Sequence, residues 1–335
     1  MRNQQTVPFD QAPRHLQIAS FIPFGLGSAI CNSIIIAAIL SQKTIRRRRE
    51  FQIINALAIA DFVEGTSTMI GGIYRVAVIN AGLKSVLFSS ARCMILPQSW
   101  LWRWADFATS FMLLVLSLDR LISVIAPFAY FRLGPSYARL MIGTPYVLSL
   151  VFSTFAWVHP LSSETKISML CMTREFISAT FYQYSKYLTA IASASSVFIY
   201  VPLLLAMRTQ MRNMSRKISL TQVRIDRKRQ NQLRVTKTIA FSSLCTLLLD
   251  AIPRAVGMYG NGLQINSVLI STGVFWMVEE LRAADPACDS LFLYLFHLTK
   301  LNSMINVCLY YKRHRPMRDA MRHLFSCSVF RATQS

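Results

Sequence analysis

Four charged residues stand inside long apolar runs of this sequence, where ionisable side chains are costly to bury and usually have a function. Asp119 and Arg120 close a run that begins near Cys93. Asp106 lies inside the same run, and Lys300 lies inside another run near the carboxyl end. Opposite charges at similar depth can pair with each other or hold a charged ligand. A lysine in an apolar pocket can also form an imine with an aldehyde.

The elements that must position these residues are long apolar segments. Hydrophobic residues make up 53% of the chain and charged residues 15%, yet the net charge is +21, which is unusual for a soluble domain. A spanning helix needs about 20 mostly apolar residues. Seven segments meet this length, at 17–41, 51–79, 94–126, 139–160, 181–207, 236–260 and 287–311. We therefore predict an all-α membrane protein, with a seven-transmembrane-helix bundle over residues 17–311.

The distribution of Lys and Arg predicts the orientation of the bundle. These residues number 23 in the connections 42–50, 127–139, 208–237 and 312–335, and seven in the opposite set. By the positive-inside rule the first set is cytoplasmic and the amino terminus lies outside. This predicts an extracellular tail at 1–16, a basic cytoplasmic loop at 208–235, an extended extracellular loop at 261–286, a short amphipathic membrane-surface helix at 312–325 and a cytoplasmic tail at 326–335.

The positive charge indicates anionic lipids as partners rather than nucleic acid. Residues 46–49 are four consecutive arginines, and a second basic cluster occupies 224–229. Both clusters lie within a few residues of predicted helix ends, where each basic side chain gains about 1 kcal/mol from an anionic leaflet. We therefore expect no nucleic-acid partner.

Other classes of function fit the sequence less well. A transporter usually shows paired halves with helices broken by Gly or Pro, and residues 17–160 and 181–311 show no such repeat. A membrane hydrolase needs a cluster of His, Ser and Asp at one depth, and the five histidines are scattered. The seven cysteines show no Cys-x-x-Cys spacing that would indicate a structural metal. We expect no enzyme, and transport is the weaker alternative.

Three cysteines have interpretable positions. Cys93 and Cys171 fall on the predicted outer side, where a disulfide would pin the loop between the fourth and fifth segments over the bundle. Two unpaired thiols are the alternative. Cys327 follows a basic stretch and is a candidate for palmitoylation, with an unmodified thiol as the alternative.

Several motifs together resemble one family. They are Leu57–Asp61 in the second segment, Asp119–Arg120 with Pro127 seven residues on, and Asn302–Tyr310, in which Val307 replaces the usual proline. With seven segments, an outside amino terminus, and Cys93 and Cys171, they resemble the rhodopsin-like G-protein-coupled receptors over about residues 17–325. The resemblance implies a plasma-membrane receptor that couples a small-molecule ligand to a heterotrimeric G protein.

The resemblance also implies roles for individual residues. Asp119, Arg120 and Tyr310 would contact the G protein. The positions that line a sodium site in this family are occupied by Asp61, Thr109, Asn302, Ser303 and Asn306. All five carry an oxygen ligand, as a hard cation requires. The alternative is a neutral Asp61 in a buried polar network, hydrogen-bonded to the two asparagines.

Some positions depart from the family pattern. Leu247 and Ala251 stand where the sixth helix usually carries aromatic residues of its core switch. Position 233 is Leu, so the sixth segment offers Arg120 no acidic partner to lock the resting state. We therefore expect high basal activity.

The outer halves of the third, sixth and seventh segments supply a candidate ligand pocket. Its residues are Trp102, Arg103, Asp106, Asp250, Arg254 and Lys300. Because both signs of charge occur at similar depth, we expect a small polar or carboxylate-bearing ligand, held by Arg103, Arg254 or Lys300, and no resident cofactor.

Two sensory functions remain open. The run Asp119–Val124, with Pro127 and Tyr130, is most similar to the nematode serpentine chemoreceptors, which would place the protein in a sensory cilium. Lys300 occupies the position where opsins carry the lysine that binds retinal, and Asp106 would then be its counter-ion. We expect instead that Lys300 pairs with Asp106 or binds an anion, and keep an opsin-like photoreceptor as the alternative.

Overall fold

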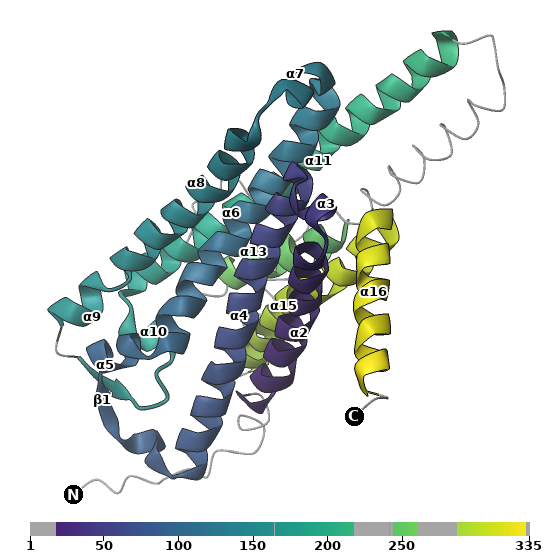
Figure 1. Ribbon diagram of the computed structural model, residues 1–335. Coiled ribbons are helices and arrows are strands. Elements are labelled where there is room, and N and C mark those ends of the chain that lie inside the picture. Colours follow the sequence, from purple (N-terminus) through teal and green to yellow (C-terminus); the bar gives the residue numbers. More distant parts are fainter. Residues whose placement is uncertain (1–17, 164, 218–240, 242–243, 260–286, 333–335) are drawn as a thin grey trace, which may run out of the picture.

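The computed structural model describes residues 18–163, 165–217, 241, 244–259 and 287–332 (Figure 1). The predicted tail at 1–16, most of the basic loop at 208–235 and the loop at 261–286 lie outside these residues, and so do Leu233 and the cluster 224–229. The side chain of Cys327 also lies outside the described part.

Five helices in the described part are long and apolar enough to cross a membrane. They are α2 (Phe21–Ser41), α4 (Arg49–Asn80), α6 (Pro97–Ile125), α8 (Pro135–Phe155) and α11 (Ala179–Lys217). These helices run along the length of one bundle (Figure 1). They coincide with the first five predicted segments, which confirms a helical, multi-pass membrane protein.

The sixth and seventh predicted segments are helical where they are described. The sixth contains η2 (Leu247–Ala251), a π-helical turn, continued by α13 (Ile252–Tyr259). The seventh is α15 (Ala287–Arg313), which contacts both α2 and α13. Single π-helical turns within helices occur frequently at functional sites.

Proline determines where the third segment begins and ends as a helix. Pro97 opens α6, because the first turn of a helix does not need the missing N–H. Leu96, directly before it, is not helical, as is usual for a residue that precedes proline. Cys93, near which the apolar run of the third segment begins, therefore lies outside the third spanning helix, in the separate short helix α5 (Ser90–Ile95).

The connections at the end of the bundle near Cys93 form a covalently linked cap. β1 (Leu87–Ser89) pairs antiparallel with β2 (Lys166–Ser168), and a disulfide joins Cys93 to Cys171, as predicted. The Tyr74 hydroxyl of α4 donates to the Met169 carbonyl over 2.9 Å. This cap also contains η1 (Leu83–Ser85), α9 (Val158–Ser162) and α10 (Thr173–Phe176).

At the opposite end, an apolar cluster joins the first, second and last helices. The connections here include α3 (Lys43–Arg46) and α7 (Pro127–Arg132). The last helix, α16 (Arg315–Ala332), places Met317 and Met321 against Ile35 of α2 and Phe51 of α4. This helix covers most of the segment 312–325 that was predicted to lie at the membrane surface, and it continues to Ala332.

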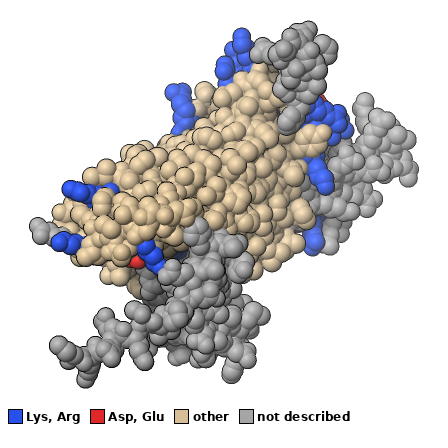
Figure 2. Space-filling view, turned by 90° about the horizontal axis from the view of Figure 1, so that it is seen from below, with Lys and Arg blue, Asp and Glu red and all other residues tan. Residues whose placement is uncertain are grey.

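The outer surface of the bundle is that of a protein in lipid. Lys and Arg lie toward the two ends on the face shown in Figure 2, and uncharged residues cover the band between them. Large apolar side chains of α8 and α11 are exposed, among them Leu140, Val147, Phe155, Ile191 and Phe198. An exposed apolar surface of this extent marks a membrane or partner interface.

The backbones of α2 and α4 are in direct contact. A Cβ added at Gly25 would lie 2.6 Å from the backbone nitrogen of Met69, and one at Gly65 would lie 2.9 Å from that of Ala29. Small residues allow this close approach between helices in membranes. The two glycines therefore fix the spacing of α2 and α4, and with it the position of Asp61 and Glu64 on α4.

We predict that Gly65→Ala destabilises the protein, because backbone atoms of α2 cannot move away as a flexible side chain could. Overpacking of this kind costs about 1–3 kcal/mol. The melting temperature of purified protein in detergent measures the effect. Gly143→Ala on α8 is the control, since a Cβ there meets nothing within 4 Å. An equal melting temperature for Gly65→Ala and Gly143→Ala would contradict the prediction.

Candidate functional site

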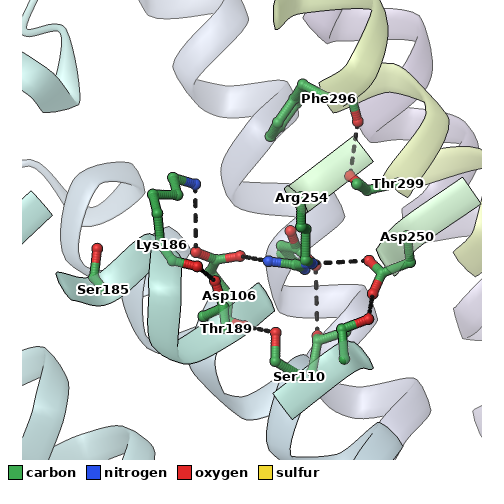
Figure 3. A network of polar contacts seen from close by, with 12 residues as sticks. Asp106, Ser110, Ser185, Lys186, Thr189, Asp250, Arg254, Phe296 and Thr299 are labelled. Atoms are coloured by element: carbon green, nitrogen blue, oxygen red, sulfur yellow. Dashed lines mark hydrogen bonds and ion pairs between the residues drawn. The ribbon is translucent and has the colours of Figure 1, made fainter. Parts of the chain in front are cut away.

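Asp106 is the centre of a buried charge cluster (Figure 3). Its carboxylate on α6 is 2.7 Å from Nη1 of Arg254, 3.6 Å from Nη1 of Arg103 and 3.8 Å from Nζ of Lys186. The residue itself is 2% exposed. Since Lys186 comes from α11 and Arg254 from α13, this single carboxylate joins three helices.

Arg254 extends the cluster to a second carboxylate. Its Nε lies 2.9 Å from Oδ1 of Asp250, four residues earlier. Asp250 stands in the π-helical turn η2 and also accepts a hydrogen bond from the Ser193 hydroxyl of α11. The structure therefore brings together Asp106, Asp250 and Arg254, as predicted for the pocket, and adds Lys186 and Ser193.

Arg103 is the member of this cluster with unused donors. The side chain is fully buried, and Nη1 donates to the Ser185 hydroxyl over 3.1 Å. Its guanidinium lies 5.0 Å from the centroid of Trp102 and 5.7 Å from that of Tyr182. Among the described residues, Nε and Nη2 have no hydrogen-bond acceptor. A buried donor without an acceptor is costly. An anion that binds these two nitrogens would remove that cost, and Arg103 would keep its hydrogen bond to Ser185.

Lys300 belongs to a second cluster, and its partner is Glu64. The ammonium of Lys300 forms a buried ion pair with Glu64 of α4. The predicted ion pair with Asp106 is therefore wrong, because Arg103, Lys186 and Arg254 already surround that carboxylate. The sequence spacing could have identified Glu64 as a partner, since it follows Asp61 by three residues and so shares its face of α4.

The residues predicted to hold sodium do line one small cavity. Asp61, Thr109, Asn302, Ser303 and Asn306 surround it together with Glu64, Asp250, Arg254, Thr299 and Leu113. The Thr109 hydroxyl donates to Oδ1 of Asp61 over 3.0 Å and lies 3.4 Å from Oε2 of Glu64. Nδ2 of Asn32 donates to the Ser303 hydroxyl over 2.7 Å.

This donor set does not fit an additional metal cation. Oxygen ligands suit sodium, but the Lys300 ammonium already supplies a positive charge beside Glu64. Across both clusters, four carboxylates face four basic side chains: Asp61, Glu64, Asp106 and Asp250 against Arg103, Lys186, Arg254 and Lys300. The formal charges balance, so a further cation would be unpaired in a region of low dielectric. Among the described residues these contacts favour a charge-balanced polar network in which Thr109, and neither asparagine, donates to Asp61.

Asp119 and Arg120 are held separately at the far end of α6. Asp119 is fully buried and accepts hydrogen bonds from the hydroxyls of Tyr130 (3.2 Å) and Tyr137 (3.3 Å). Burial, and next the Asp119 carboxylate, raise the pKa of Tyr130 to about 12. The Tyr130 phenol therefore stays protonated and remains a donor at physiological pH.

Arg120 has an acidic partner that the sequence reasoning missed. Its Nη1 lies 3.1 Å from Oε2 of Glu50, in the first turn of α4. The expectation that Arg120 lacks a carboxylate was based on the sixth segment alone, and the second segment supplies one. Tyr310, near the end of α15, is buried in the apolar cluster with Ile35, Phe51 and Met317.

A comparison of the sequence with protein families finds one family. The family model of the seven-transmembrane receptors of the rhodopsin family matches residues 31–310. This match begins within α2 and ends at Tyr310, so it includes every residue of the two charge clusters. No curated protein matches the chain significantly.

We predict that stability does not respond specifically to sodium in the wild type and does so in Lys300→Met, where Glu64 loses its cation. A cation that binds only the folded state stabilises it in proportion to its occupancy. Melting temperatures in sodium chloride and choline chloride at equal ionic strength measure the effect. Lys186→Met is the control, because Asp106 keeps Arg103 and Arg254. A sodium-specific shift in the wild type would count against Lys300 as the resident cation.

Proposed function

Because the chain belongs to the rhodopsin family of seven-transmembrane receptors, we propose that it is a G-protein-coupled receptor for a small extracellular molecule. Proteins of this family are receptors, not enzymes. The proposal includes seven spanning helices with the amino terminus outside, in the plasma membrane of a chemosensory cell or its cilium. The excess of Lys and Arg in one set of connections supports that orientation.

One observation supports G-protein coupling above the others. Arg120, at the end of α6 in the family's Asp-Arg position, forms an ion pair with Glu50, whose side chain is part-buried at 30% exposure. In a two-state receptor, ligand binding shifts the equilibrium by its difference in affinity for the two states. Glu50 would hold Arg120 in the resting state, and release of this pair would free Arg120 for the G protein, together with Asp119 and Tyr310.

The ligand is proposed to carry a carboxylate that binds Arg103. A guanidinium binds a carboxylate through two parallel N–H donors, and Nε and Nη2 of Arg103 are both without acceptors among the described residues. Arg254 and Lys300 are weaker candidates because each already contacts a carboxylate closely. Trp102 and Lys186 would form the side of the site, with the Lys186 ammonium 5.2 Å from the Trp102 centroid.

A second candidate function is supported by the pair of Lys300 and Glu64. A buried lysine with a carboxylate beside it is the arrangement that an opsin-like pigment needs. Lys300 would hold retinal, and Glu64, not Asp106, would be the counter-ion. Bound retinal would supply absorption of visible light.

We predict opposite effects from the two partners of the Arg120 ion pair. Arg120→Ala should abolish second-messenger output, because the group that contacts the G protein is lost. Glu50→Gln should raise basal output about fivefold, since a partly exposed pair is worth about 1 kcal/mol. Both variants are assayed in transfected cells at matched surface expression. Full output from Arg120→Ala, or unchanged basal output from Glu50→Gln, would refute this assignment of roles.

One screen distinguishes the two candidate functions. We predict that small carboxylic acids activate the wild type and fail to activate Arg103→Gln, while visible absorption after incubation with retinal isomers stays that of free retinal. Lys300→Ala is the matched variant for the pigment. A red-shifted band that Lys300→Ala lacks would establish the opsin alternative, and activation by purely apolar compounds alone would contradict the acid-binding site.

A further inference from the structure

A groove opens on the outside of the bundle at the end that carries Arg120. It lies between α2, α3, α4 and α8, and has a cavity volume of about 340 Å³. Ligand sites in proteins commonly have about 300–1,000 Å³. Its rim contains Arg46 and Arg139, and its walls include Ile59, Ile142 and Tyr146. None of the described residues that line it is acidic.

The depth of the groove corresponds to one leaflet of a bilayer. Ile59 lies ten residues beyond the start of α4 at Arg49, a rise of about 15 Å along a helix. Half of the hydrocarbon core is also about 15 Å. The groove therefore reaches from the level of the basic connection to the middle of the membrane, with its charged residues at the shallow end.

The two arginines at the rim are available for a ligand. Within the described chain, neither Arg46 nor Arg139 takes part in an ion pair or side-chain hydrogen bond. Arg49 differs, since it donates to the carbonyls of Leu133 (2.6 Å) and Tyr130 (3.0 Å). The Arg46 backbone is held in place by Gln52, whose Nε2 donates to its carbonyl over 3.1 Å. Among the described residues, the rim thus offers two exposed cations without ion-pair partners, one from α3 and one from α8.

The wall of the groove contains one more unused polar atom. Oδ1 of Asn55, on α4 between the rim and Ile59, is buried and has no donor among the described residues. Tyr146 does not supply one, because its hydroxyl donates to the Ala56 carbonyl over 2.6 Å. Asn55 thus lines the groove and has hydrogen-bonding capacity that no described residue uses.

From these contacts we propose that the groove is a specific binding site for an anionic phospholipid of the leaflet at the Arg120 end. Arg46 and Arg139 would bind the phosphate, Asn55 would accept from a headgroup or glycerol-linked hydroxyl, and an acyl chain would lie along Ile59 and Ile142. A sterol would use Asn55 but leave both arginines unpaired, which is why the phospholipid is favoured. The proposal is independent of the ligand and G-protein assignments.

The test measures retained lipid on the full-length protein. Protein purified in mild detergent is incubated with phosphatidylglycerol and phosphatidylcholine, and native mass spectrometry counts the molecules of each that remain bound. Each arginine at an anionic surface favours binding about fivefold. We expect one phosphatidylglycerol molecule per chain, favoured over phosphatidylcholine, and a loss of about 25-fold in that preference for the double variant Arg46→Gln/Arg139→Gln.

Matched variants separate a built site from general surface charge. Arg47→Gln/Arg132→Gln removes the same charge from the same end, outside the groove lining, and should keep the bound lipid. Ile142→Trp fills the groove without a change of charge and should release it. Because Arg46 and Arg139 are exposed, their replacement should leave the melting temperature in phosphatidylcholine unchanged.

Three results would overturn the proposal. Equal losses in the two arginine pairs would show only non-specific attraction to basic loops. Displacement of phosphatidylglycerol by inorganic phosphate would show an anion site with no role for the lipid chains. Tighter binding of cholesterol, unaffected by loss of both arginines and reduced by Asn55→Leu, would assign the groove to a sterol.

Discussion

The pairing of buried charge is the constraint on which the arrangement of helices depends. Asp106 joins α6 to α11 and α13, and Glu64 joins α4 to α15 through Lys300. Removing one partner of a buried pair costs about 3–5 kcal/mol, because the other charge is left uncompensated. Each helix must therefore keep the rotation that faces its charge toward the neighbour.

The third spanning helix, α6, is common to every cluster. It carries Arg103 and Asp106 in the outer half, Thr109 beside Asp61, and Asp119 with Arg120 at the far end. A single rigid helix thus contacts the candidate ligand site, the buried polar network and the candidate coupling site. Because both residues lie on α6, a rotation or tilt of this helix at Asp106 would also move Arg120, with no need for a chain of side-chain contacts between them.

The spanning helices could be predicted from the sequence because length and apolar content determine them locally. The partners of the charges could not, since each pair depends on how two helices are rotated against each other. Lys300 was expected near Asp106, which is equally buried, but three closer cations occupy that carboxylate and leave Glu64 for Lys300. The helix is interrupted at Leu96, which separates Cys93 from α6. This interruption could be predicted from Pro97, because a residue before proline disfavours the helical conformation.

The glycine contact between α2 and α4 has a consequence for motion. Because Gly25 and Gly65 bring backbone against backbone, sliding or rolling of one helix over the other would force main-chain atoms together. These two helices must then move as one rigid body. Any rearrangement that opens the Arg120 end is then left to the other helices, so α2 and α4 would serve as the stationary frame against which α6, α11 and α13 turn.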